Sequence, residues 1–269
     1  MRSAYSWESV VDEFVFIVGP PLAAGVAATI GPPAALALTA VIGASGTAAL
    51  LAQTSTEPAP RPETRLGGRL AITYPGMPAV VLVMAMLGVV FAGVEVTVIA
   101  TAREGGSVAA AGVVLALWSV SSMLSGLFIG GTQRLPGLPV QLLGGAAATM
   151  LLLTPLLFVH SLVGISAVLF FAGAGVSPAL IAGFALAARL VPAPALTQAL
   201  TWTSTAIGVG FAFGAPASGW LVDEISINAG FWVAITAAVV ATVAALGGLR
   251  SMAHRLGDPG ESTDSVRGV

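Results

Sequence analysis

The feature that most constrains this chain is a series of long apolar segments separated by short polar or turn-forming stretches. A helix needs about 20 mainly apolar residues to cross the hydrocarbon core of a bilayer. The apolar segments cover approximately residues 5–30, 33–53, 77–101, 109–130, 138–158, 162–188, 195–221 and 228–249. They are too long for barrel strands and lack an alternating pattern. We therefore predict an all-α fold, a polytopic transmembrane bundle of about eight spans.

The charge content favours lipid over water as the main surroundings of the chain. Only 8% of the 269 residues are charged and 57% are hydrophobic. Soluble domains carry about 25% charged residues. So few charges cannot cover a water-soluble surface, and we expect the lipid bilayer to be the principal partner.

The arginines predict the orientation in the membrane. All 10 basic residues are arginines, and with a cytoplasmic N-terminus only Arg103 falls outside. The other nine are Arg2, Arg61, Arg65, Arg69, Arg134, Arg189, Arg250, Arg255 and Arg267. Cytoplasmic loops are enriched in basic residues. We therefore predict a multi-pass protein of the cell inner (plasma) membrane with both termini in the cytoplasm.

Polar stretches divide the chain unevenly. Two predicted spans lie in residues 1–53, and a proline-rich cytoplasmic loop follows at 54–76. Six further spans lie in 77–250, where we expect a helical bundle. Residues 251–269 are polar, with a composition typical of a disordered tail.

The sequence also contains an internal repeat at an offset of 195 residues. The matching pairs are Ala4 with Ala199, Trp7 with Trp202, Ser9 with Ser204, Gly19 with Gly214, and Pro21 with Pro216. Both copies begin at the predicted cytoplasmic face, so they would run in the same direction, as parallel repeats of some transporters do. The repeat unit would hold six spans, and the first span would then be the fifth of its unit.

In this register the chain resembles helices five to twelve of a major facilitator superfamily transporter. In "VGPPLAAG", Gly19 and Pro20 match the start of the Gly-Pro-x-x-Gly-Gly motif of the fifth helix in drug/proton antiporters. With one extra residue before the final pair, Gly25 matches the last glycine and Ala24 replaces the other. In "GGTQRLPGLP", only Gly130 and Arg134 remain of the Gly-x-x-x-Asp-Arg-x-Gly-Arg-Arg-like motif that the family often carries between helices eight and nine. The strings "ESVVDEFVFIVGP", "GVEVTVIA" and "PALIAGFALAARLVP" resemble actinobacterial members of the superfamily.

The resemblance implies the last two helices of an N-terminal half followed by a complete six-helix C-terminal half. It also implies a secondary transporter, with proton-coupled transport or efflux of a small molecule by alternating access. The alternative is a non-transporting remnant, or a partner subunit of a split transporter. Four explanations compete for the absence of the first four helices: a misassigned start codon, a split gene, a pseudogene fragment or a true eight-span protein. In the first two, the missing N-terminal helices would be supplied by a longer or a separate chain.

Acidic residues in apolar segments are the first candidates for substrate binding or coupling, because a carboxylate in lipid normally faces a cavity or a partner. Glu95 lies well inside the third segment. The first segment carries Glu8, Asp12 and Glu13, which either couple ions or form an interfacial cluster. Tryptophans are typical interfacial anchors, and Trp118, Trp202, Trp220 and Trp232 are assigned that role. For Trp202 a position lining the cavity is the alternative.

Glycines and prolines of the repeat are candidates for helix packing. Glycine allows close helix approach, and proline kinks a helix. The residues are Gly19, Pro20, Pro21, Gly25, Gly214 and Pro216. They form either a gating seam between transporter halves or an ordinary kinked contact. Arg134, in a cytoplasmic loop, is assigned to topology.

Other functions lack a sequence signal. With no cysteine and 2 histidines, we predict no metal site. The chain has no Walker-type sequence for an ATPase, and neither Gly-x-Ser-x-Gly nor His-Glu-x-x-His for a hydrolase. We therefore expect no enzyme, no cofactor and no nucleic-acid partner.

Overall fold

The computed structural model describes residues 15, 18–19, 22–23, 25–54, 69–132 and 135–257. Within these ranges the chain forms helices and turns and no strand, which confirms the all-α prediction for this part. The long helices are α2 (Pro32–Leu51), α3 (Met77–Glu104), α4 (Val108–Gly131), α5 (Leu138–Leu153), α6 (Leu162–Leu190), α7 (Leu196–Glu224) and α8 (Phe231–Gly257). The short 3-10 helices are η2 (Ala71–Thr73), η3 (Thr154–Leu157), η4 (Ala193–Ala195) and η5 (Ile227–Gly230).

Seven stretches of the described residues are long and apolar enough to cross a membrane, which indicates a membrane protein. They coincide with the predicted segments from 33–53 onward. The predicted first span, 5–30, falls largely outside the described residues, so the total of eight remains a prediction.

Turn-forming residues set several helix starts. Proline occupies the first turn of α2, α3 and α5, where its missing N–H costs no hydrogen bond. Gly76 precedes α3 with a φ of 91°, a left-handed conformation that favours glycine. The Ser161 side chain caps α6 by accepting a hydrogen bond from the Gly164 N–H at 3.2 Å.

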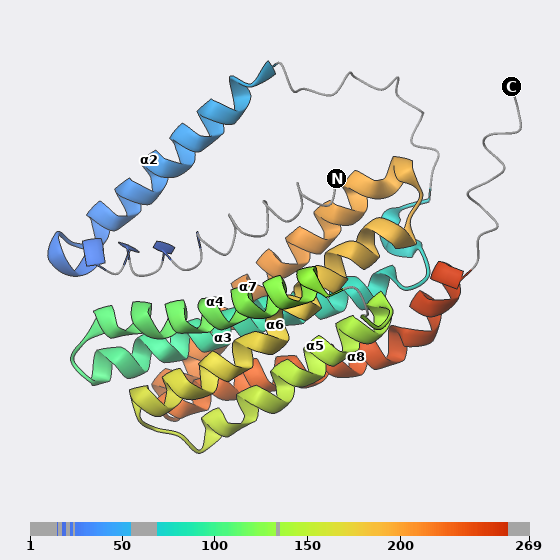
Figure 1. The fold of residues 1–269 in the computed structure, drawn as a ribbon. Helices are drawn as coiled ribbons and strands as arrows, with labels where there is room; N and C mark the ends of the chain where they lie inside the picture. Colours follow the sequence, from blue (N-terminus) through green and yellow to red (C-terminus); the bar gives the residue numbers. More distant parts are fainter. Residues whose placement is uncertain are drawn as a thin grey trace, which may run out of the picture.

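Helices α3 to α8 pack into one bundle, with α3 at its centre (Figure 1). Helix α3 packs most extensively along α7 and α8, α4 packs along α6, and α5 packs on α6 and α8. If α3, α4 and α5 are matched in order with α6, α7 and α8, each of these contacts has an equivalent. The α3–α7 contact corresponds to α4–α6, the α3–α8 contact corresponds to α5–α6, and the α5–α8 contact corresponds to itself. Because successive helices alternate in direction, the helices matched by this exchange run in opposite directions.

Small residues bring α3 and α7 into close backbone contact. A Cβ atom added at Gly88 would meet the backbone of Ile207. A Cβ atom at Gly210 would meet the carbonyl oxygen of Ala85, and one at Gly214 would lie 2.9 Å from the Val89 Cα. Because lipid removes most of the hydrophobic drive for helix association, such close packing is a principal source of bundle stability.

Helix α8 continues to Gly257, beyond the predicted end of the bundle near 250. Tertiary contact explains the extension, because Met252 is fully buried and lies against Gly76 at the start of α3. The final part of the predicted 54–76 loop is likewise packed on the bundle. The Ala71 N–H donates to Oε1 of Gln198 at 2.6 Å.

Helix α2 lies apart from this bundle (Figure 1). None of its residues is buried, and no described helix packs extensively along it. At the offset of the internal repeat, its first residue, Pro32, corresponds to Ile227, the start of η5 that leads into α8. The repeat offset therefore relates α2 to α8.

Candidate functional site

The candidate site centres on Glu95, which lies within α3 and is half-buried. No hydrogen bond or ion pair joins its carboxylate to the described residues. Thr97 and Thr101, its polar neighbours on α3, already have hydrogen-bond partners. Their hydroxyls donate to the carbonyls of Gly93 and Thr97 at 2.7 and 2.8 Å. The Glu95 carboxylate therefore has no partner among the described residues, whereas a carboxylate in a membrane span normally faces a cavity or a partner.

An aromatic pair adjoins Glu95. Phe91 lies one turn earlier on the same side of α3, and its ring contacts Trp118 of α4. The ring centroids are 5.5 Å apart with the planes inclined by 56°, a favourable tilted arrangement. A Cβ atom at Gly173 of α6 would meet the Trp118 carbonyl oxygen, so α6 approaches the pair closely. One turn before Glu95, α3 therefore packs closely against apolar parts of α4 and α6.

Trp118 is only 7% exposed, so its predicted role as an interfacial anchor is wrong. Hydropathy cannot distinguish a tryptophan at the membrane surface from one buried between helices. The indole Nε1–H of Trp118 is buried and has no hydrogen-bond partner within the described structure. A buried donor without a partner carries a desolvation cost, and such groups call for an explanation. Trp118 on α4 and Glu95 on α3 thus carry a donor and an acceptor that have no partner among the described residues.

We predict that Trp118→Phe leaves the thermal unfolding midpoint of the full chain almost unchanged. Phenylalanine keeps most of the apolar ring and removes the unpaired donor, so the two effects oppose each other. Trp118→Ala should cost about 3–5 kcal/mol because it opens a cavity. Thermal unfolding in detergent measures both variants, and a Phe variant as unstable as the Ala variant would show that the N–H has a structural partner.

A second polar cluster joins α3, α7 and η5. Ser218 is fully buried, and its Oγ lies 3.2 Å from Thr97 Oγ1. The same hydroxyl lies 3.1 Å from the Gly230 carbonyl oxygen and 3.3 Å from that of Gly93. All members of the cluster have partners within the protein, so the cluster serves helix packing.

Ser218→Ala is expected to destabilise the bundle by about 0.5–2 kcal/mol, the range for interhelical hydrogen bonds in membranes. The matched control is Ser204→Ala on the same helix, because Ser204 is exposed. A thermal melt of the two variants should show a lower midpoint for Ser218→Ala alone. Equal midpoints would contradict the proposed bridging role.

The structure separates the other candidates. Gly214 is buried where α7 meets α3, whereas Pro216 is exposed within the continuous helix α7. Trp202 is 38% exposed and lies twelve residues before Gly214, about 18 Å along the helix. Gly214 lies against Val89, which is six residues before Glu95 on α3. Trp202 and Glu95 therefore lie at different depths of the bundle.

The candidates near the N-terminus are mostly outside the described residues. At Gly19 and Gly25, an added Cβ atom would meet no described atom within 4 Å. The remaining candidates, Glu8, Asp12, Glu13, Pro20, Pro21 and Arg134, are not among the described residues. Their coupling, packing and topology roles stay predictions.

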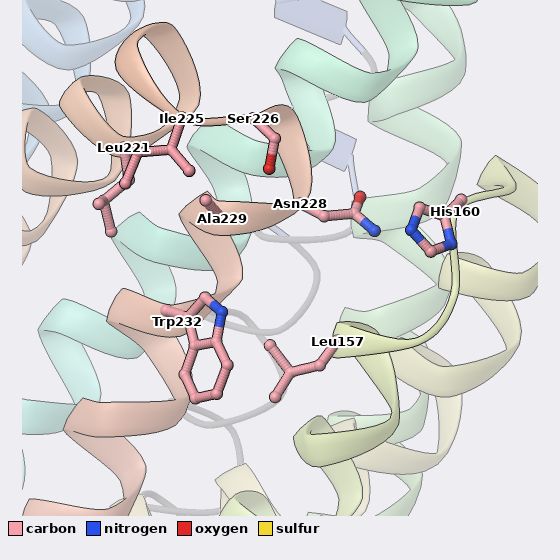
Figure 2. Close-up of a pocket in the computed structure, with 8 residues that line it drawn as sticks. All are labelled: Leu157, His160, Leu221, Ile225, Ser226, Asn228, Ala229 and Trp232. Carbon is pink, nitrogen blue, oxygen red and sulfur yellow. The ribbon is translucent and has the colours of Figure 1, made fainter.

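A cavity of about 400 Å³ opens where α7 turns into α8, beside the turn from η3 to α6. Its lining residues are Leu157, His160, Leu221, Ile225, Ser226, Asn228, Ala229 and Trp232. Figure 2 shows the side chains of Asn228 and His160 facing each other across the two turns. The Asn228 amide also donates to the Val159 carbonyl at 3.1 Å, which joins the turns. The sequence carries no signal for this cavity, because its lining residues come from two turns, and the helix ends beside them, that are far apart in the sequence.

Among the described residues, no three histidine, aspartate or glutamate side chains cluster closely enough to hold a metal ion. In comparisons with protein families, curated proteins and solved structures, none matches this chain significantly.

Proposed function

We propose that this chain is a secondary transporter of the major facilitator type that moves a small molecule, with proton coupling, by alternating access. The observation that supports the proposal is that the contacts of α3, α4 and α5 correspond to those of α6, α7 and α8, with the matched helices running in opposite directions. Nested inverted repeats of three helices are a property of the six-helix halves of this superfamily.

Glu95 supplies the chemistry of the proposed site. Its carboxylate lies within a membrane-spanning helix and lacks a protein partner among the described residues. It would bind a proton or a positively charged group of the substrate in alternation. Phe91 and Trp118 provide the adjacent apolar surface, and the close contact of α3 with α7 keeps the bundle rigid as it moves.

The distribution of arginines supports a location in the plasma membrane with cytoplasmic termini. Arg69 lies just before η2, which leads into α3, and Arg189 and Arg255 lie near the ends of α6 and α8. These three positions are at one end of the bundle. Arg103 lies at the opposite end, near the end of α3. The arginine-rich end would face the cytoplasm.

The alternative proposal is a partner subunit or non-transporting remnant, and the position of α2 favours it. Its repeat equivalent, α8, is held by α3 and α5. Helix α2 has no comparable neighbour in the described part of the chain. Helices from a separate polypeptide would bury α2 in such an assembly.

The experiment that tests the proposal is reconstitution of the full chain into liposomes with an imposed pH gradient. A panel of radiolabelled cationic, neutral and anionic small molecules is tested with and without a proton uncoupler. We expect gradient-dependent movement of at least one compound, abolished by the uncoupler. If no compound moves and no compound elicits a proton flux, the transporter proposal fails and the partner-subunit alternative is preferred.

A further inference from the structure

A second cavity, of about 340 Å³, lies as a groove between the start of α3 and the end of α8. Small or apolar residues line it, among them Ala79, Leu82, Gly247 and Ser251. Leu82 is 42% exposed, so the groove opens to the outer surface of the bundle. Both helices are membrane-spanning by length and hydropathy. The groove therefore faces the hydrocarbon region and can be filled by an acyl chain.

Two arginines lie at one end of this groove. The guanidinium carbon of Arg69 is 5.5 Å from the ring centroid of Tyr74, and that of Arg255 is 5.8 Å from the same centroid. Arg255 lies one turn beyond Ser251 on the same face of α8. Tyr74 lies two residues before Gly76, which also lines the groove. The apolar groove therefore leads to a pair of cations.

Local contacts also orient Arg69. Its Nε donates to the Thr73 hydroxyl at 3.0 Å, and an Nη donates to the Thr73 carbonyl at 2.7 Å. A guanidinium has five N–H donors, so Arg69 retains donors beyond these two bonds. Guanidinium groups match the geometry of phosphate oxygens, and basic pockets beside membrane helices suit anionic headgroups.

We propose that this groove is a binding site for an anionic phospholipid. One acyl chain occupies the space between α3 and α8, and the phosphate is held by Arg69 and Arg255. The arginines at one end of the groove match an anionic headgroup, and the apolar lining matches an acyl chain, so we infer that the occupant is an anionic phospholipid. This site is remote from Glu95 and does not depend on transport activity.

Two sets of variants test the headgroup contacts and the acyl-chain groove separately. Arg69→Gln combined with Arg255→Gln removes the cations, and Arg250→Gln is the control because Arg250 is exposed near the same end of α8. Gly247→Leu fills the groove, since an added Cβ atom at Gly247 meets nothing within 4 Å. Gly144→Leu on α5 is its control, being equally open at its Cβ position.

The test is native mass spectrometry of the full chain titrated with phosphatidylglycerol, with phosphatidylcholine of the same acyl chains, or with inorganic phosphate. We expect phosphatidylglycerol to bind at least about tenfold more tightly than phosphatidylcholine, with about fivefold lost per arginine. Gly247→Leu should weaken both lipids and Gly144→Leu neither. Thermal midpoints without lipid check folding, and the single variant Arg69→Gln replaces the double variant if the latter unfolds.

Three results would overturn the proposal: equal affinity for the two lipids, lipid binding by Gly247→Leu equal to that by Gly144→Leu, or inorganic phosphate displacing the bound phosphatidylglycerol. The last result would assign the arginines to a free anion.

Discussion

Gly210→Ala is expected to lower the thermal unfolding midpoint of the chain strongly, whereas Gly208→Ala leaves it unchanged or slightly higher. The added methyl at Gly210 would overlap the carbonyl oxygen of Ala85 and lie 2.8 Å from its carbonyl carbon. Backbone cannot give way as a flexible side chain does, so α7 must move away from α3. Overpacking of this kind costs about 1–3 kcal/mol or more, equivalent to roughly 5–10 °C in a chain of this size.

The Gly208 variant makes this comparison specific. Gly208 lies on the same helix, and a Cβ atom there meets nothing within 4 Å. In a helix interior, alanine is up to about 1 kcal/mol more stabilising than glycine. The difference in helix propensity therefore favours alanine at both positions. Thermal melts in the same detergent compare the two variants. Equal midpoints for both would mean that α3 and α7 do not approach each other at Gly210.

Under the proposed transporter function, Glu95→Gln is expected to reduce proton-driven transport by at least about tenfold, because the amide is nearly the same size but cannot bind and release a proton. Any remaining movement should no longer depend on the pH gradient. Folding should be preserved, since a neutral amide in a membrane helix costs less than a carboxylate. The measurement is substrate flux in liposomes with and without the uncoupler, beside a thermal melt of the same sample.

The matched control for Glu95 is Glu104→Gln, which changes an exposed acid at the end of the same helix. That variant should transport normally. Unchanged flux and unchanged proton dependence in Glu95→Gln would refute the coupling role of Glu95, whatever the outcome for the control.

The spans could be predicted because the length and hydropathy of a segment are local properties of the sequence. Helices α3 and α6 begin at the predicted residues, and Pro78 lies in the first turn of α3 while Ser161 caps α6. Glu95 could be selected in the same way, because a lone carboxylate in an apolar span stands out. Local signals did not predict the extra turns of α8, which depend on the contact of Met252 with Gly76.

The amino-acid sequence by itself determined that the chain forms long apolar helices, where most of them begin and end, and which of them carries an acid. Only the tertiary structure decided which side of each helix is buried. In a soluble protein the apolar face identifies the core, but here residues facing lipid and residues facing another helix are equally apolar. The burial of Trp118, the contact of Gly210 with α3 and the groove beside Arg69 and Tyr74 therefore depend on how the helices are rotated and paired, which hydropathy does not encode.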